Sequence, residues 1–155
     1  MPQALALAAV LAGIDQTSKW LIVFGLNLQT GVPHAVLPFL DIRLLWNSGI
    51  SYGLLDSSSA LGQWLILAMG SVITLGFLWA LRNATSPMLR MAYALIIGGA
   101  LGNLVDRILH GAVVDFISLH HDGYYWYVFN LADIWITLGV MVLIFDIIRG
   151  DKEVA

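Results

Sequence analysis

Cysteine is absent from this chain of 155 residues, and charged residues make up only 11% of it. The absence of cysteine excludes thiol catalysis, disulfide bonds and cysteine-based metal sites. Soluble domains usually carry about 25% charged residues, so solvation by water alone does not explain this composition. The net charge is −3 and no basic run is present, which argues against a nucleic-acid partner.

Hydrophobic residues are abundant instead, at 59% of the chain with a mean hydropathy of +0.85. They gather in four stretches, each near the roughly 20 residues that a helix needs to cross a hydrocarbon core. These continuous runs lack the alternation of barrel strands, so we predict a mainly α, integral membrane bundle of four transmembrane helices. We expect one membrane-embedded domain over residues 1–155, with spans at roughly 4–26, 60–81, 88–109 and 131–148.

The first stretch also has an alternative interpretation as a cleaved signal peptide. It carries no Lys or Arg before its apolar part, and the apolar sequence WLIVF resumes after the polar segment DQTSK. A signal peptide has a basic start and a single short apolar core. A retained span is therefore the better interpretation.

The basic residues predict the orientation of the bundle. Four of the seven bracket the short link between the second and third spans or follow the fourth span: Arg82, Arg90, Arg149 and Lys152. The positive-inside rule places these four residues in the cytoplasm. Both termini are then expected to be cytoplasmic as well.

Two connections should therefore lie on the outer side, at residues 27–59 and 110–128. The first contains FLDIRLLWN and ISYGLL, where β-branched and aromatic residues stand near turn formers. This pattern predicts a small extracytoplasmic β-sheet. The second contains the aromatic run YYWY, whose side chains suit the interface between membrane and water.

The polar residues of the apolar segments share one property, because each lies near the outer end of a span or just beyond it. They are Asp15, Lys19, Asn103, Asp106, Arg107, Asp115, Asn130 and Asp133. A charged group in hydrocarbon costs roughly 2.5–3.5 kcal/mol, so such groups tend to face the bundle interior and to mark function. The small residues of GGALG in the third span allow another helix to approach closely. We therefore expect a polar pocket at the outer interface.

Each of these residues also has a purely structural interpretation. Asp133 could be the capping partner of Asn130 at the start of the fourth span. The pair Asp15 and Lys19, on one helix face, is interpreted as structural or substrate-positioning rather than catalytic. Asp115 stands in the apolar stretch AVVDFI with no obvious helix end to serve. Together, Asp115 and Asp133 favour a catalytic interpretation over a purely structural one.

Two neighbouring carboxylates cannot both ionise cheaply, so they share a proton and their pKa values separate. The ionised one removes a proton from water, and the protonated one polarises a carbonyl or protonates the leaving amine. Asp133 lies near a positive helix start, so it is interpreted as the base and Asp115 as the acid. No serine stands in a G-x-S-x-G context, and the histidines have no H-E-x-x-H spacing. We expect no metal and no organic cofactor.

Five motifs occur in order along the chain: DQTSK at 15–19, NSGISYG at 47–53, GGALGNLVDR at 98–107, VVDFI at 113–117 and FNLAD at 129–133. In this order they closely resemble the bacterial lipoprotein signal peptidases, also called signal peptidase II. The resemblance covers nearly the whole chain, including its length and its four-span layout. One departure is Tyr52, where the family usually has Phe, and it affects only local loop packing.

The resemblance implies an aspartyl endopeptidase of the bacterial plasma (inner) membrane. Such an enzyme removes the signal peptide from a prolipoprotein, cutting just before the Cys that carries a diacylglyceryl group. The family's two catalytic aspartates fall on Asp115 and Asp133. Its supporting residues fall on Asp15, Lys19, Asn47, Gly49, Asn103, Asp106, Arg107 and Asn130. It also implies a small sheet in 27–59 that cradles lipid and substrate, and a short outer helix or flap between the third and fourth spans.

A small membrane transporter or channel subunit is the alternative from another class, with Asp15, Lys19 and Asp106 as an ion or proton relay. A relay requires polar groups at several depths, whereas the inner halves of the last three spans are nearly bare of ionisable groups. A non-enzymatic lipoprotein-binding protein would not need both Asp115 and Asp133. The expected partners are prolipoprotein substrates and membrane lipids, with the chain acting as a monomer.

Overall fold

The structure is a computed structural model that describes residues 1–49 and 60–150. Its helices are α1 (Pro2–Trp20), which continues into the π-helix η1 (Leu21–Gly25), α2 (Ala60–Arg82), α3 (Pro87–His110) and α4 (Leu131–Gly150). Its strands are β1 (His34–Leu37), β2 (Leu40–Asn47), β3 (Val113–His121) and β4 (Tyr124–Phe129). Within this part of the chain four helical segments have the length and hydropathy to cross a membrane, which confirms the predicted fold class.

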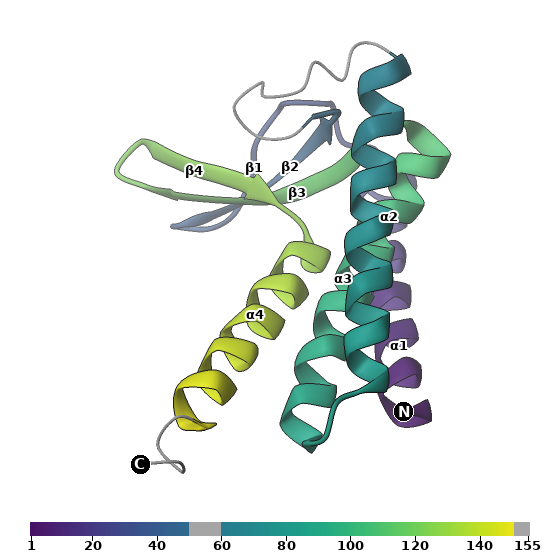
Figure 1. The fold of residues 1–155 in the computed structure, drawn as a ribbon. Helices are drawn as coiled ribbons and strands as arrows, with labels where there is room; N and C mark the ends of the chain where they lie inside the picture. The colour runs from purple at the N-terminus through teal and green to yellow at the C-terminus, as the bar shows by residue number, and fades with distance from the viewer. Residues whose placement is uncertain (50–59, 151–155) are drawn as a thin grey trace.

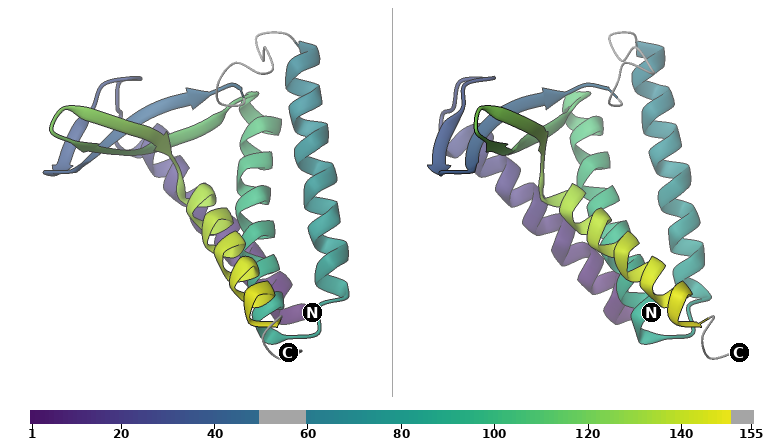
Figure 2. Two further views of the ribbon diagram at one scale, coloured as in Figure 1. Left: turned by 60° about the vertical axis from the view of Figure 1, so that its left-hand side comes forward. Right: turned by 90° about the vertical axis from the view of Figure 1, so that its left-hand side faces the viewer.

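Helix α3 is the central element of the bundle, because α1, α2 and α4 all pack against it. The left view of Figure 2 shows α3 between α2 on one side and α1 and α4 on the other. The amino end of α1 and the carboxyl end of α4 point to the same end of the bundle, and the sheet lies across the other end (Figure 1). The site described below lies at the sheet end.

The ends of α3 follow from local sequence. Ser86 is the N-cap, and its hydroxyl oxygen accepts a hydrogen bond of 3.0 Å from the Leu89 backbone N–H. Pro87 occupies the first turn, where its missing N–H is harmless. Gly111 ends the helix with a φ of +69°, a left-handed conformation that costs glycine little. The chain then turns directly into β3.

Two glycines in the motif GGALG explain why the other helices come so close to α3. A Cβ on Gly98 would lie 2.9 Å from the Ala8 carbonyl oxygen of α1. A Cβ on Gly99 would collide with the Ala132 carbonyl oxygen in the first turn of α4. Side chains at these two positions would push α1 and α4 away. The small-residue face predicted for this span is therefore its contact surface.

The four strands form one antiparallel sheet in the order β1-β2-β3-β4. The central pair joins two segments far apart in the sequence, with Leu45 opposite Asp115 and Asn47 opposite Val113. Ile22 of η1 packs in an apolar cluster with residues of this pair, namely Leu44, Val114 and Phe116. Because side chains alternate along a strand, Asp115 points to the opposite face from Val114 and Phe116.

The sheet differs in part from the prediction. Strands β1 and β2 lie in the expected segment 27–59, and ISYGLL lies outside the described residues. The connection from α3 to α4 was expected to contain a short helix or flap, and the helix is wrong, because this connection forms the β3–β4 hairpin. The physical reason is readable in the sequence. Asp122 and Gly123 have φ values of +48° and +81° between runs of β-branched and aromatic residues, which is the pattern of a tight hairpin turn.

Candidate active site

A cavity of about 620 Å³ lies between the sheet and the adjoining ends of α3 and α4. Asp115 from β3 and Asp133 from α4 both line it. The other polar lining residues are Asn47, Gly49, Asn103 and Arg107, and the remaining lining residues are Val113, Trp126, Tyr127, Phe129, Ile134, Thr137 and Leu138. The cavity therefore combines two carboxyl groups with a largely apolar and aromatic wall.

Asp133 serves as a helix cap and faces the cavity at the same time. The Asn130 side-chain oxygen accepts a hydrogen bond from the Asp133 N–H at 3.1 Å, and Asp133 Oδ2 accepts one from the Asn130 N–H at 3.2 Å. This reciprocal pair is a capping box. The other carboxylate oxygen, Oδ1, accepts a bond of 3.0 Å from Asn103 Nδ2. The capping interpretation is thus correct, and it leaves the carboxylate at the cavity.

Asp115 is buried at the base of the sheet and is held by two amides. Its Oδ2 accepts a hydrogen bond of 2.9 Å from Asn47 Nδ2, and its Oδ1 accepts one of 2.6 Å from Asn130 Nδ2. Asn130 therefore joins the two aspartates, because its oxygen receives the Asp133 amide while its nitrogen reaches Asp115. The pair is linked through one side chain.

Burial raises the pKa of the Asp115 carboxyl from 3.8 to about 6. The hydrogen bond from Asn47 opposes this rise, the nearby negative charge of Asp133 adds to it, and the bond from Asn130 opposes it again. Desolvation and a like charge both disfavour an ionised carboxylate, whereas donated hydrogen bonds favour it. Asp115 is thus the carboxyl that retains a proton into the mildly acidic range, in the same direction as the acid role interpreted for it.

Arg107 brings a fixed positive charge to the same cavity. Its guanidinium is near enough to Asp115 and Asp133 for electrostatic attraction, and its Nη2 lies 3.5 Å from the Gly49 carbonyl oxygen. A guanidinium presents several donors in a rigid plane. Such a group beside two carboxyls is suited to stabilise negative charge that develops on a substrate oxygen.

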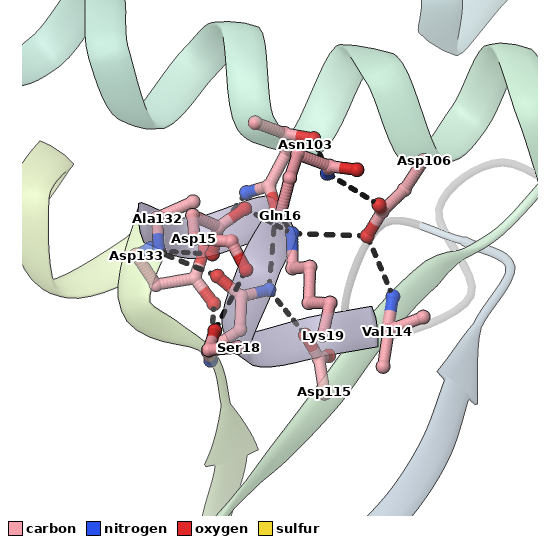
Figure 3. A network of polar contacts seen from close by, with 12 residues as sticks. Asp15, Gln16, Ser18, Lys19, Asn103, Asp106, Val114, Asp115, Ala132 and Asp133 are labelled. Carbon is pink, nitrogen blue, oxygen red and sulfur yellow. Dashed lines mark hydrogen bonds and ion pairs between the residues drawn. The ribbon is translucent and has the colours of Figure 1, made fainter. Parts of the chain in front are cut away.

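A second polar cluster lies directly behind the cavity, enclosed between α1 and α3 (Figure 3). Lys19 Nζ lies 2.7 Å from Asp15 Oδ2 and 2.9 Å from Asp106 Oδ2, and all three side chains are buried. The ammonium also donates to Asn103 Oδ1 at 3.0 Å. The ion pair expected between positions 15 and 19 is present, and Asp106 is a third member of the same cluster.

The predicted site residues therefore form two adjoining groups. Six line the cavity: Asn47, Gly49, Asn103, Arg107, Asp115 and Asp133. Three form the buried cluster: Asp15, Lys19 and Asp106. Asn130 bonds Asp115 and Asp133 directly, as well as Asn103. The catalytic and supporting roles of these residues remain predictions.

Sequence reasoning missed several residues of this region. Gln16 belongs to the buried cluster, where its Nε2 donates to Asp106 Oδ1 at 2.7 Å and to the Gly102 carbonyl oxygen at 3.0 Å. Thr137 lines the cavity one helical turn after Asp133, and that spacing was available as a signal. The aromatic residues of β4 were interpreted only as interface residues. Trp126 and Tyr127 line the cavity as well.

The histidines at this end of the molecule make other contacts. His120 Nε2 lies 3.2 Å from Asp41 Oδ1 on β2, and the His110 ring packs edge-on against Trp46 at 5.3 Å. Among the residues that the structure describes, no three or more histidine and acidic side chains come together as metal ligands would.

Comparison with known proteins identifies the family to which the chain belongs. The family model for signal peptidase II, a peptidase family, matches residues 7–149. A lipoprotein signal peptidase of Methylorubrum extorquens is 45% identical over 94% of this chain and 84% of its own. One of Polynucleobacter necessarius is 39% identical over 94% and 88%. A solved bacterial membrane enzyme superposes with a TM-score of 0.86 at 27% identity, covering 99% of this chain and 92% of that one.

Proposed function

The chain belongs to the signal peptidase II family, and we propose that it hydrolyses the peptide bond before the diacylglyceryl-modified Cys of a prolipoprotein. Hydrolysis there releases the signal peptide and leaves the lipid-bearing Cys as the new amino terminus. One observation carries the proposal. Asp115 and Asp133, from a strand and a helix far apart in the sequence, line one cavity at the end of a four-helix membrane bundle.

The two carboxyl groups act as a base and an acid. Ionised Asp133 takes a proton from a water molecule whose oxygen attacks the scissile carbonyl carbon. Protonated Asp115 donates to the carbonyl oxygen, and Arg107 stabilises the charge that develops on that oxygen. When the C–N bond breaks, the proton taken by Asp133 passes to the leaving amine. As the carbonyl re-forms, one hydroxyl of the tetrahedral diol returns its proton to Asp115. Asp133 is then ionised and Asp115 protonated again, and no covalent enzyme intermediate forms.

The walls of the cavity fit a substrate that is already in the bilayer. Ile134, Thr137 and Leu138 extend the cavity along α4 away from the sheet, and we assign this surface to the apolar signal peptide. Trp126, Tyr127 and Phe129 form the wall on the sheet side, where amphipathic rings suit the level at which the lipid-modified Cys meets water. The scissile bond then lies between the two surfaces, beside the aspartates.

The protein is a multi-pass membrane protein, and we place it in the bacterial inner membrane with both termini in the cytoplasm. The amino end of α1 and the carboxyl end of α4 lie at one end of the bundle (Figure 1), as does the α2–α3 link, which Arg82 and Arg90 flank. The positive-inside rule assigns that end to the cytoplasm. The cavity then opens at the outer interface. One chain supplies both aspartates and every lining residue, so we propose a single domain that acts as a monomer, with surrounding lipids as its other partners.

The transporter alternative is not favoured. Asp15, Lys19 and Asp106 pair with one another in a single enclosed cluster rather than at successive depths along a path. The family also accounts for both aspartates, whereas a relay accounts for neither.

The test is cleavage of a synthetic prolipoprotein peptide with a diacylglyceryl-modified Cys by the purified full-length protein in detergent or lipid. We expect the wild-type chain to cut before that Cys and Asp133→Asn to leave the peptide intact. Asp122→Asn is the matched control, because Asp122 is an exposed aspartate at the hairpin turn and Asn tolerates its positive φ. Cleavage by Asp133→Asn at the wild-type rate would refute the assignment.

A further inference from the structure

Lys19 does not line the cavity. Chains of two hydrogen bonds or ion pairs nevertheless connect its ammonium to Asp133, or to the residue directly before Asp115 or Asp133. Its ammonium has three hydrogen-bond donors and no acceptor. Three oxygens receive it: Asp15 Oδ2 at 2.7 Å, Asp106 Oδ2 at 2.9 Å and Asn103 Oδ1 at 3.0 Å. Each of these three partners also holds an atom next to the dyad, and Figure 3 shows them converging around the ammonium.

The first route runs through Asp15 to α4. While Oδ2 of Asp15 pairs with Lys19, its Oδ1 accepts a hydrogen bond of 2.9 Å from the Ala132 N–H. Ala132 is fully buried and directly precedes Asp133 in the first turn of the helix. Lys19 thereby holds the carboxylate that fixes the backbone from which Asp133 projects.

The second route is the counterpart of the first on the sheet. Asp106 Oδ2 accepts a hydrogen bond of 3.0 Å from the Val114 N–H and also pairs with Lys19. Val114 directly precedes Asp115 on β3. The backbone before each aspartate is thus tied to a carboxylate, and both carboxylates are tied to the same ammonium.

The third route runs through a side chain. Asn103 Oδ1 accepts from Lys19, so Asn103 Nδ2 is left to donate to Asp133 Oδ1 at 3.0 Å. The reversed amide would put an NH₂ group against the ammonium and an oxygen against a carboxylate. Asn130 supports the same orientation, because its Nδ2 lies 3.2 Å from Asn103 Oδ1. Lys19 and Asn130 together determine which end of this amide faces the base.

We propose that Lys19 is a positioning residue for the dyad, which holds Asp115 and Asp133 in their working arrangement through Ala132, Val114 and Asn103. The inference rests on the proposed function, because it concerns the same reaction. Lys19 never meets the substrate, and its effect is to keep a hydrogen-bond donor on the ionised carboxylate and to fix the separation of the two groups. A residue of this kind changes the chemical step and its pH dependence rather than substrate binding.

Removal of Lys19 alone would leave two buried carboxylates without a counter-charge, which destabilises a protein strongly. The decisive variant therefore keeps the net charge of the cluster at its wild-type value. Asp15→Asn combined with Lys19→Met removes one charge of each sign, and the carbonyl oxygen of the introduced amide still accepts from the Ala132 N–H. The reference is Asp15→Asn alone, which retains Lys19.

Relative to that reference, the double variant is expected to lose about 10- to 100-fold in kcat, with KM little changed. The acid limb of its kcat/KM profile should move to higher pH by about one unit, because the base loses a firmly held donor. Both quantities are measured on the lipid-modified peptide across a pH series. A residue that served only the packing of α1 would lower thermal stability and leave the acid limb in place.

Gln16→Leu is the matched control. Gln16 bonds Asp106 and the Gly102 carbonyl in the same cluster, and none of its bonds reaches Asn103, Ala132 or Val114. We expect its melting temperature to fall while its acid limb stays at the wild-type position.

The inference is overturned if the double variant and Asp15→Asn have the same kcat and the same acid limb. The proposed function would not be affected by that result. A wild-type chain that fails to cleave the peptide would overturn both. If the double variant does not fold, Asp106→Asn with Lys19→Met carries the same charge balance, with Asp106→Asn as its reference. An unchanged limb in that pair would also overturn the inference.

Discussion

The cavity and the buried cluster behind it each contain two aspartates from different elements, but the two regions treat them differently. In the cluster, Asp15 and Asp106 share the cation Lys19 and accept main-chain hydrogen bonds, and all three side chains are sealed. In the cavity, Asp115 and Asp133 are held by the neutral amides of asparagines and the capping backbone, and they face open space.

This difference shows how the surroundings of an aspartate suit it either to a buried ion pair or to a cavity in which it can exchange a proton. A carboxylate paired with a buried cation contributes to stability, because its removal leaves the cation without a partner. A carboxyl that accepts its hydrogen bonds from neutral amides can gain and lose a proton more readily. Asp115, with a pKa of about 6, is a carboxyl of this second type. Four predictions sharpen or break the comparison.

The largest effect is expected at the cavity aspartates. Asp115→Asn keeps the shape of the side chain but removes proton exchange, so single-turnover cleavage should fall by about 10²- to 10⁴-fold. Its melting temperature in detergent should fall far less than its activity, because the amide oxygen still accepts one of the two hydrogen bonds that Asn47 and Asn130 donate and no buried charge is left without a partner. A variant that cleaved normally, or that lost activity only by unfolding, would show that Asp115 has no catalytic role that sets it apart from the cluster aspartates.

The cluster aspartate should show the opposite pattern. Asp15→Asn removes half of the charge that Lys19 faces and weakens one charge-assisted bond, so we expect a loss of about 3 kcal/mol in unfolding free energy. The single-turnover rate of the folded fraction should change far less than it does in Asp115→Asn. Thermal melting and single-turnover rates, measured on the same preparation, decide the matter. A large rate loss at unchanged stability would move Asp15 into the catalytic group.

The close approach of α4 to α3 keeps the two regions adjacent, and Gly99 makes it possible. Gly99→Ala would collide with the Ala132 carbonyl oxygen, a backbone atom that cannot step aside, so we expect about 2 kcal/mol of destabilisation. Gly76→Ala on α2 is the control, since nothing lies within 4 Å of its added methyl group. Melting temperatures of the two variants should diverge. Equal values would show that this contact is not tight.

The smallest effect concerns pH. The acid role that we propose for Asp115 requires its protonated form, so kcat/KM should decline as pH rises through about 6. The bond from Asn47 opposes the rise in the pKa of Asp115. Asn47→Leu removes that bond, so the pKa should rise further and the alkaline limb should move to higher pH by about one unit. A limb that moved to lower pH would contradict the acid role of Asp115.

Much of the fold follows from the sequence, because a membrane span is a local property. About 20 apolar residues in a row must form a helix in hydrocarbon, where no water satisfies the backbone. The predicted spans accordingly begin and end within two residues of the observed helices. The β3–β4 hairpin was locally encoded too, in Asp122 and Gly123, but the aromatic run beside them was interpreted as an interface segment instead of a strand.

The sequence by itself also determined which polar residues gather, since every one of them lies at the same end of the bundle. Only the tertiary structure decided how they divide into a cavity and a sealed cluster. That division depends on whether a carboxylate meets Lys19 or an asparagine, and hence on the contact of Gly99 with α4 and on the strand register that places Asp115 opposite Leu45. Such contacts join residues far apart along the chain, and no local pattern specifies them.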